Sequence, residues 1–222
     1  MFTNLLNGAP FNDGNGQCSG HVRVYAYNDD DSFWQQKGGN IDGEAQGDES
    51  GYSVSLSADG SVVAIGATLN DGANKIDSGH VRVYRYNPNK TRAVTEQSAS
   101  NYGPIGWDRI GDDIDGEAVT DKTGTSVTLS ADGSIVAIGA TDNNGQAGSD
   151  SGHVRVYEYN GSSWEQKGLD IDGEAQGDKS GNSVSLSADG SILAIGAPFN
   201  SGNGDKSGHA RVYKFTGWGL GT

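Results

Sequence analysis

The heptapeptide SGHVRVY occupies residues 19–25, 78–84 and 151–157, and it returns as SGHARVY at residues 207–213. Self-similarity of this kind is typical of chains built from stacked supersecondary units, so the repeat decides the fold class before any other feature. A residue that every unit carries belongs to the shared architecture more readily than to one active site. The histidines of the four copies follow one another at intervals of 59, 73 and 56 residues and are His21, His80, His153 and His209.

The composition agrees with many short strands joined by tight turns. Of the 222 residues, 36 are glycine and only 33% are hydrophobic, which would indicate disorder in a chain without a repeat. The net charge of −14 disfavours binding to nucleic acid or to an anionic membrane surface. No apolar run approaches the roughly 18 residues of a membrane span, so we expect no membrane insertion. Cys18 is the single cysteine, which excludes an internal disulfide.

The third unit shows the strand pattern most clearly. Trp164 opens a first strand; Val184 and Leu186 then alternate with serines, as in a half-buried strand. Residues 192–195 are continuously apolar, as in a strand covered on both faces, and residues 207–215 form a fourth strand. Four short antiparallel strands linked by hairpins make the blade of a β-propeller, so we predict an all-β propeller of four-stranded antiparallel blades.

The repeat predicts a single propeller domain over residues 1–222, with about three and a half to four blades. A partial blade covers 1–27, and a further blade starts at 216–222. The repeat units lie at about 33–86, 106–159 and 163–215. An insertion in the second unit, roughly residues 87–104, has no periodicity and is expected to be an exposed loop. Three modes of closure remain open: a four-bladed ring, a head-to-tail dimer, or a fragment of a longer array.

Each unit also combines two glycine motifs. The G-x-S-V motif stands at residues 51–54, 124–127 and 181–184, and the G-A-P or G-A-T motif at 8–10, 66–68, 139–141 and 196–198. Followed by G-H-V-R-V-Y, these motifs resemble the FG-GAP repeat of integrin-α-type β-propellers, in the variant common in secreted and cell-surface proteins. The resemblance implies an extracellular or cell-surface propeller. It departs from the family pattern where Ser50, Thr123 and Ser180 replace the phenylalanine of the FG pair.

The resemblance does not carry over the family's calcium loop. That loop is shortened here to Ser-Ala-Asp-Gly, and one aspartate cannot supply the six to eight oxygens that calcium prefers. A candidate Ca²⁺ site lies instead in the acidic turn after the first strand, where carboxylates recur around a glycine. The alternative is that the aspartates cap the turn through backbone amides while the glutamates are solvated. The candidate ligands are Asp42, Glu44, Asp48, Asp115, Glu117, Asp121, Asp172, Glu174 and Asp178.

Catalysis finds little support in the sequence. The histidines occupy one repeat position, and a catalytic site needs a constellation of residues that is unique in the chain. We therefore expect no catalytic residue, no bound organic cofactor and no enzymatic activity. Asn89 and Asn160 fit the N-glycosylation sequon and fall in predicted loops, where a glycan would be accessible.

The sequence therefore predicts a non-enzymatic extracellular or cell-surface β-propeller. Its function would be binding or adhesion, with a protein or polysaccharide surface as partner. The alternative is a structural subunit of a larger assembly, in which chains self-associate and share incomplete blades by strand addition. The opening residues show no signal peptide, but this carries little weight in a chain that starts in mid-repeat.

Overall fold

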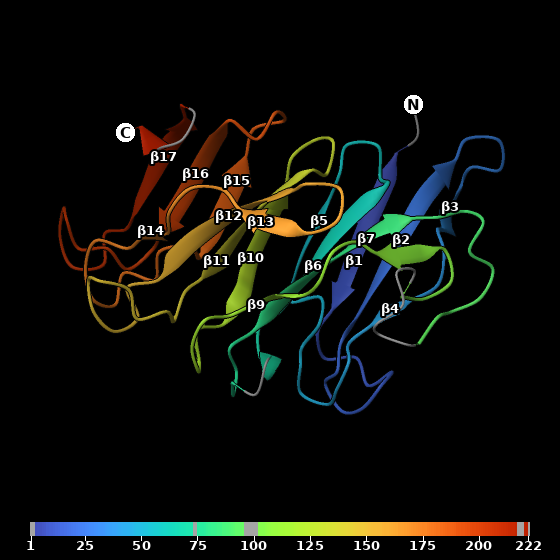
Figure 1. Cartoon of the computed structure of the whole chain (residues 1–222), viewed down its shortest axis with the longest axis horizontal. Coiled ribbons are helices and arrows are strands. Elements are labelled where there is room, and N and C mark those ends of the chain that lie inside the picture. The colour runs from blue at the N-terminus through green and yellow to red at the C-terminus, as the bar shows by residue number, and fades with distance from the viewer. Residues whose placement is uncertain (1–2, 73–74, 96–101, 217–219, 222) are drawn as a thin grey trace.

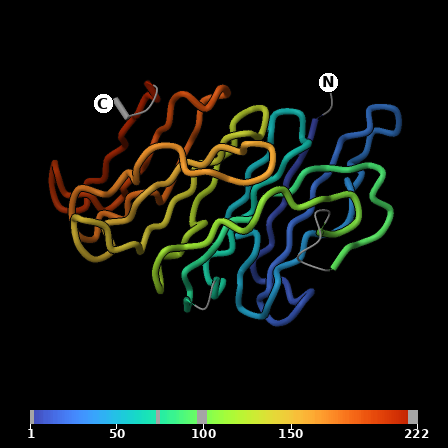
Figure 2. The backbone as a smooth tube through the Cα atoms, viewed as in Figure 1, coloured from blue at the N-terminus to red at the C-terminus, as the bar shows by residue number. Residues whose placement is uncertain are grey.

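The computed structural model describes residues 3–72, 75–95, 102–216 and 220–221. These residues form antiparallel sheets and no α-helix, so no helix in the described ranges is long and apolar enough to cross a membrane. The four sheets stand side by side in chain order, from blue at the N-terminal end to red at the C-terminal end (Figure 1). The tube trace shows the two termini at opposite ends of this row (Figure 2). The predicted all-β propeller fold is confirmed.

The sheets share one strand order. In the first, β1 (Asn4–Ala9), β2 (His21–Asn28) and β3 (Phe33–Gln36) are neighbours, and β4 (Ile41–Asp42) also pairs with β2. The second contains β5 (Ser53–Leu56), β6 (Val62–Ala67), β7 (His80–Tyr86), β8 (Trp107–Arg109) and β9 (Ile114–Asp115). The third contains β10 (Thr123–Leu129), β11 (Ile135–Ala140), β12 (His153–Tyr159), β13 (Trp164–Gln166) and β14 (Ile171–Asp172). The fourth contains β15 (Ser183–Leu186), β16 (Ile192–Ala197), β17 (His209–Phe215) and β18 (Leu220–Gly221).

The tryptophan-bearing strand closes a sheet and does not open one. Trp164 on β13 stands opposite Tyr159 on β12, because the short link between these strands folds back as a hairpin. Each sheet therefore begins with the G-x-S-V strand, except the first, whose described residues start at β1. In the fourth sheet Leu220 stands opposite Phe215, at the register position that tryptophan takes elsewhere. Trp218, expected to open an equivalent strand, lies outside the described residues.

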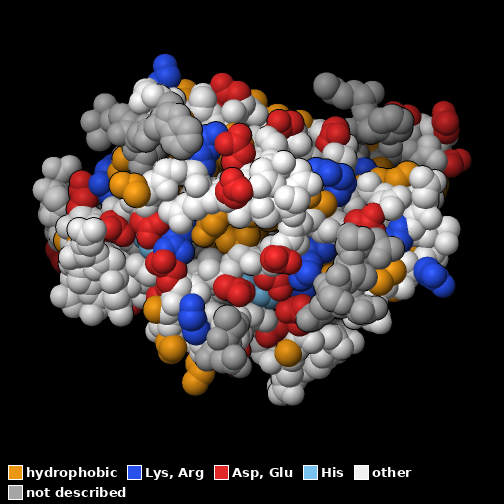
Figure 3. All heavy atoms as spheres, in the orientation of Figure 1, with side chains coloured by type: hydrophobic (Ala, Val, Ile, Leu, Met, Phe, Trp, Pro, Cys, Tyr) orange, Lys and Arg blue, Asp and Glu red, His pale blue; other side chains and the backbone are white. Residues whose placement is uncertain are grey.

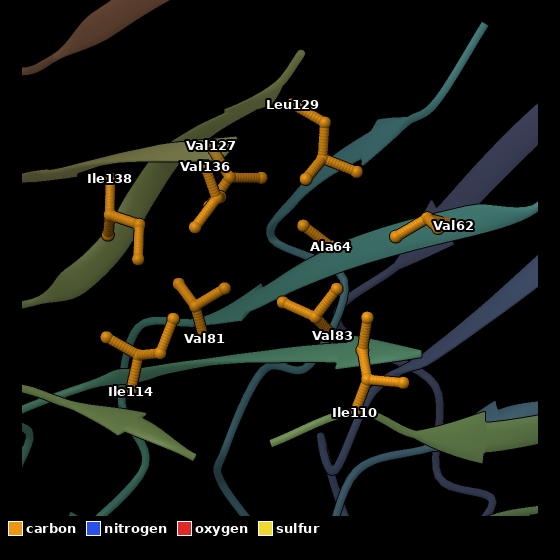
Figure 4. Close-up of a cluster of buried hydrophobic side chains, with 10 residues drawn as sticks. All are labelled: Val62, Ala64, Val81, Val83, Ile110, Ile114, Val127, Leu129, Val136 and Ile138. Atoms are coloured by element: carbon orange, nitrogen blue, oxygen red, sulfur yellow. The ribbon is translucent and has the colours of Figure 1, made fainter. Parts of the chain in front are cut away.

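Apolar side chains fill the three interfaces between neighbouring sheets. Figure 4 shows the middle cluster, in which Val62 and Val83 of the second sheet face Leu129 and Val136 of the third. The first interface is built in the same way around Trp107, which is fully buried and donates from its Nε1 to the carbonyl oxygen of Lys37 in the preceding sheet, at 3.0 Å. A third cluster joins the third and fourth sheets. Burial of these alternate positions is what holds adjacent blades together.

The outer face of the fourth sheet is different. Ile192 and Val212 are 43% and 67% exposed, whereas the equivalent Val62 and Val83 of the second sheet are each 1% exposed. These positions have the same chemistry in each unit but lose their exposure only where a following sheet covers them. The two central sheets are consequently the best packed.

The glycines of the two repeat motifs meet where neighbouring sheets come closest. Gly139, at the end of β11, lies so close to the carbonyl oxygen of Gly181 that an added Cβ would overlap it. Gly181 itself has a φ of 86°, in the left-handed region that favours glycine. The pairs Gly8 with Gly51 and Gly66 with Gly124 repeat this contact. The motif glycines therefore fix the spacing between blades.

The described part of the second-unit insertion packs against β8. Lys90 is buried and donates from its Nζ to the carbonyl oxygen of Trp107 at 2.7 Å, and it pairs with Asp108 at 2.9 Å. Val94 and Gly103 exchange backbone hydrogen bonds, which closes the base of the insertion. The expectation of an exposed loop is wrong for this part. A lysine in a polar segment suggests exposure, and the sequence does not show that the Trp107 carbonyl oxygen and Asp108 satisfy its buried ammonium group. Residues 96–101 lie outside the described ranges.

Substitution of one motif glycine tests the spacing constraint. Gly139→Ala should lower the free energy of unfolding by about 2 kcal/mol or more, since the methyl group must displace the Gly181 backbone. Gly196→Ala is the matched control. Gly196 has the same motif position on the equivalent strand β16, but a new Cβ there meets no backbone of another sheet. Urea denaturation measures both, and equal losses would show that the inter-sheet contact is not the cause.

Candidate functional site

The third carboxylate of each acidic turn, an aspartate, caps the turn. Asp48, Asp121 and Asp178 are almost fully buried. Their carboxylates accept hydrogen bonds from the backbone amides three residues earlier, those of Ala45, Ala118 and Ala175, at 2.9, 2.9 and 3.1 Å. This geometry matches the alternative in which aspartates cap turns.

The glutamate of each turn reaches the next sheet. Glu44 pairs with Arg82 at 3.2 Å, Glu117 pairs with Arg155, and Glu174 pairs with Arg211 at 3.1 Å. Because the arginine belongs to the repeated heptapeptide, each pair joins one blade to its successor. The glutamates are thus inter-blade ion-pair partners, a role that no single unit could reveal.

The first aspartate of each turn lies beside the repeated histidine of its own sheet. Asp42, Asp115 and Asp172 stand opposite His21, His80 and His153 in the strand register. Burial raises the pKa of Asp115, helped by the nearby charge of Asp113. The three carboxylates of one turn therefore point in different directions.

Two clusters bring acids and histidine together across a blade boundary instead. Their ligand atoms lie within 4.8 Å of one another, and they consist of Glu44, His80 and Asp113, and of Glu117, His153 and Asp170. Within the described residues no such cluster is formed by the carboxylates of one turn. Figure 3 shows acidic side chains around the middle of this face, with histidine and basic side chains among them. The first cluster lines an acidic cleft of about 640 Å³, which also includes Asp48, Asp71, Asp77 and Asp115.

Arginines already compensate the first cluster. Arg82 contacts Glu44, and Arg109 contacts Asp113 at 3.0 Å. Burial and these two arginines hold the pKa of His80 well below its usual range, so His80 is neutral. The cluster therefore has a structural explanation without a metal ion, and Ca²⁺ binding at the acidic turns stays a prediction.

The two sequon asparagines are both exposed in turns. Asn160 donates from its side-chain amide to Ser163 at 3.0 Å and to Glu165 at 2.6 Å, so a glycan there would replace a turn contact. Asn89 lies in the described start of the second-unit insertion. Glycosylation at Asn89 and Asn160 stays a prediction.

The ion pairs between blades differ in burial, which predicts different energetic roles. Arg82 is 2% exposed, so Arg82→Met should lower the free energy of unfolding by about 3 kcal/mol or more, because it removes one charge of a buried ion pair. Arg211→Met is the matched control, since this arginine has the same repeat position but its ion pair with Glu174 is better solvated, and its loss should cost within about 1 kcal/mol. Urea denaturation of both variants decides. A loss for Arg82→Met as small as for Arg211→Met would show that the buried pair has no structural role.

A second cleft lies where the inner strands of three sheets meet. We call it the inner-edge cleft; it has a volume of about 420 Å³ and lies at the ends of β5, β10 and β15. The second, third and fourth sheets all contribute to it. Its lining residues are Glu49, Tyr52, Thr68, Leu69, Lys122, Thr125, Thr141, Asp142, Lys179, Asn182 and Phe199.

The units differ from one another in this cleft. One repeat position is Glu49, Lys122 and Lys179 in successive units, and another is Tyr52, Thr125 and Asn182. Tyr52 and Phe199 are about half exposed, which leaves two aromatic rings available to a ligand. A site with several non-equivalent polar and aromatic residues has the asymmetry that a catalytic constellation requires.

Charges in the inner-edge cleft are paired. Asp142 contacts the Nζ of Lys122 at 3.0 Å and the Nζ of Lys179 at 2.9 Å. Burial opposes ionisation of Asp142, but hydrogen bonds from Lys179, Lys122 and Thr141 outweigh it and lower its pKa. Burial raises the pKa of Glu49, although the charge of Lys122 acts in the opposite direction. Glu49 is therefore a better proton acceptor than an ordinary surface glutamate.

The backbone at the charged position is left-handed. Glu49, Lys122 and Lys179 have φ values of 56°, 55° and 54°. Cys18, Asp77, Asp150 and Lys206, which each precede a Ser-Gly pair, have φ values of 48–56°, so this conformation belongs to the repeated turn. The geometry holds three long charged side chains at the mouth of the cleft.

Sequence reasoning missed the inner-edge cleft because it followed what the units share. The signal that would have found it is divergence: within otherwise repeated segments, residues 49, 52 and 142 differ in type from their counterparts. That signal needs the structure to show that divergent positions from three units meet.

The FG-GAP repeat model matches residues 165–213, so the resemblance to this family is confirmed in that unit. No curated protein matches the chain. Among solved structures, the fold is similar to that of a protein from Bacteroides uniformis named as a 6-phosphogluconolactonase, with a TM-score of 0.53 and 12% identity over 96% of this chain and 51% of that one. It is also similar to the periplasmic gluconolactonase of Pseudomonas aeruginosa, with a TM-score of 0.53 and 16% identity over 97% of this chain and 50% of that one.

The chain thus spans about half the length of these structures, and at such identities the likeness establishes the fold. It nevertheless overturns the functional expectation from the sequence. The prediction of a non-enzymatic adhesion module or structural subunit, and with it the prediction of no enzymatic activity, is wrong on this comparison, because the similar structures are named as lactonases. The physical reason is that repeat equivalence argued against a unique site, whereas the inner-edge cleft gathers residues that are not equivalent.

Proposed function

We propose that the chain is a lactone-hydrolysing β-propeller whose active site is the inner-edge cleft. The observation that carries the proposal is the joint presence of Glu49, Lys122 and the exposed ring of Tyr52 in one cleft lined by three sheets. A base, a cation and an aromatic surface are what hydrolysis of a sugar lactone needs. The names of the two similar structures support this reaction class.

The cleft offers complementary groups to a polyhydroxylated ring. The apolar face of a sugar ring stacks on aromatic side chains, and Tyr52 and Phe199 are both exposed at the cleft. Ring hydroxyls can pair with Thr125 and Asn182, which supply hydroxyl and amide groups. A volume of about 420 Å³ suits one small ring.

The reaction requires one proton acceptor and one electrophilic group. Water attacks the lactone carbonyl carbon while the Glu49 carboxylate takes a proton from that water. The negative charge that forms on the carbonyl oxygen is stabilised by the ammonium group of Lys122. The ring C–O bond then breaks, its electron pair stays on the leaving oxygen, and the proton held by Glu49 neutralises it. The product is the open-chain hydroxy acid.

We also infer that the protein works outside the cytoplasm. The similar gluconolactonase of Pseudomonas aeruginosa is periplasmic, and the FG-GAP variant resembled here is common in secreted proteins. Fractionation of producing cells tests this location, and recovery of the protein in the cytoplasmic fraction alone would contradict it.

Replacement of the base tests the activity. Hydrolysis of gluconolactone, followed by pH-stat and corrected for the spontaneous reaction, should fall about 100-fold or more in Glu49→Gln, because the amide cannot accept the proton. Glu174→Gln is the control, since this glutamate pairs with Arg211 outside the cleft and should keep wild-type activity. A wild-type rate equal to the spontaneous rate would contradict the proposed function.

The pH profile provides a separate test of the same base. Because burial raises the pKa of Glu49 above its ordinary value of 4.5, the carboxylate is protonated and inactive in acid. We expect kcat/KM to rise with pH through an apparent pKa above 4.5 and then to level off. A profile that is flat across this range would show that Glu49 is not the base.

A further inference from the structure

Asp142 occupies a repeat position of the inner-edge cleft where the fold does not require an acid. Leu69 and Phe199 occupy the same repeat position in the second and fourth sheets, where they line the same cleft. The strand before this position and the turn after it are alike in all three units. The architecture therefore accepts an apolar side chain here, and the aspartate calls for an explanation in the site itself.

The contacts of Asp142 explain the charge. One carboxylate bridges Lys122 at 3.0 Å and Lys179 at 2.9 Å, and Thr141 donates to the same carboxylate at 3.0 Å. Two cations from neighbouring sheets, which would otherwise form a positive pocket, thus share one acid. Glu49 supplies a second negative charge, so the four charged side chains of the cleft sum to zero.

We propose that Asp142 determines the substrate class by excluding anionic ligands, so that the cleft accepts an uncharged sugar lactone and rejects its phosphorylated form. The inference rests on the proposed function for the identity of the cleft as the ligand site. Although Asp142 compensates the charge of both lysines, their ammonium groups can still donate hydrogen bonds to a neutral lactone carbonyl. They offer no uncompensated positive charge to a phosphate dianion, which would also meet the carboxylates of Asp142 and Glu49 in a chain of net charge −14. This is specificity through an unfavourable contact with the wrong ligand.

The experiment uses inorganic phosphate as the probe, because it needs no hydrolysis to be detected. Isothermal titration should show weak phosphate binding by the wild type and at least a tenfold gain in affinity in Asp142→Asn, which leaves both lysines without their shared acid. Increasing salt should weaken the gained binding, as expected for an ion contact. The same variant should also hydrolyse 6-phosphogluconolactone with a lower KM than the wild type.

Three further variants keep the test decisive. Asp142→Leu introduces the residue of the equivalent position in the second sheet and should show the same gain if Asp142→Asn folds poorly. Asp150→Asn removes an acid that contacts Lys179 alone, at 3.2 Å, and should change phosphate affinity less than threefold. Adding Lys122→Met to Asp142→Asn should abolish the gain.

The outcomes separate the two proposals. Phosphate affinity that is equal in the wild type and Asp142→Asn, or an equal gain in Asp150→Asn, would overturn the role of Asp142. Failure of the wild type to hydrolyse gluconolactone, with the phosphate gain present, would overturn the proposed function and leave Asp142 as the residue that excludes anions from the cleft.

Discussion

The close approach of two backbones at each blade boundary is the constraint on which the other contacts depend. Gly139 at the end of one strand and Gly181 at the start of the next sheet leave no space for a Cβ between them. Ser126 of the third sheet donates to the same Gly181 carbonyl oxygen at 2.7 Å, so a hydrogen bond holds the two sheets at this close approach. At this spacing the valines and isoleucines of facing sheets interlock, and the glutamate of one turn reaches the arginine of the next blade. In this chain the glycines of the G-x-S-V and G-A-P or G-A-T motifs set the distance between neighbouring blades.

The fold could be predicted from the sequence because its causes are local. The alternation around Val184 and the apolar run at residues 192–195 each specify a strand without reference to distant residues. The pairing of Trp164 with the preceding strand was less accessible, because periodicity marks a strand and not its partner. The four-strand pattern of the repeat can be read from any of its strands, so the sequence does not show where one sheet ends. The hairpin between β12 and β13 shows it in the structure.

The candidate site could be predicted only in part, because its contacts cross blade boundaries. The carboxylates of an acidic turn are close in sequence, but the fold separates them: Asp48 accepts a hydrogen bond from a backbone amide of its own turn, and Glu44 pairs with Arg82 of the next sheet. The inner-edge cleft shows the reverse, since its residues are far apart in sequence and close in the fold. Tyr52, Lys122 and Asp142 are unremarkable in sequence, and they meet in one cleft only because three sheets bring divergent positions together. In this chain the residues that all units share build the scaffold. The residues that differ between units line the inner-edge cleft, and there they make the units chemically different.

Contacts between sheets also decide where a ligand of the inner-edge cleft would act. The second and third sheets bury a shared apolar cluster, and the third and fourth sheets bury another. The inner-edge cleft lies across both of these boundaries, with Leu69 from the second sheet, Lys122 from the third and Phe199 from the fourth. A ligand in the cleft would therefore touch three sheets at once, and its binding energy would also stabilise the packing of those sheets against one another.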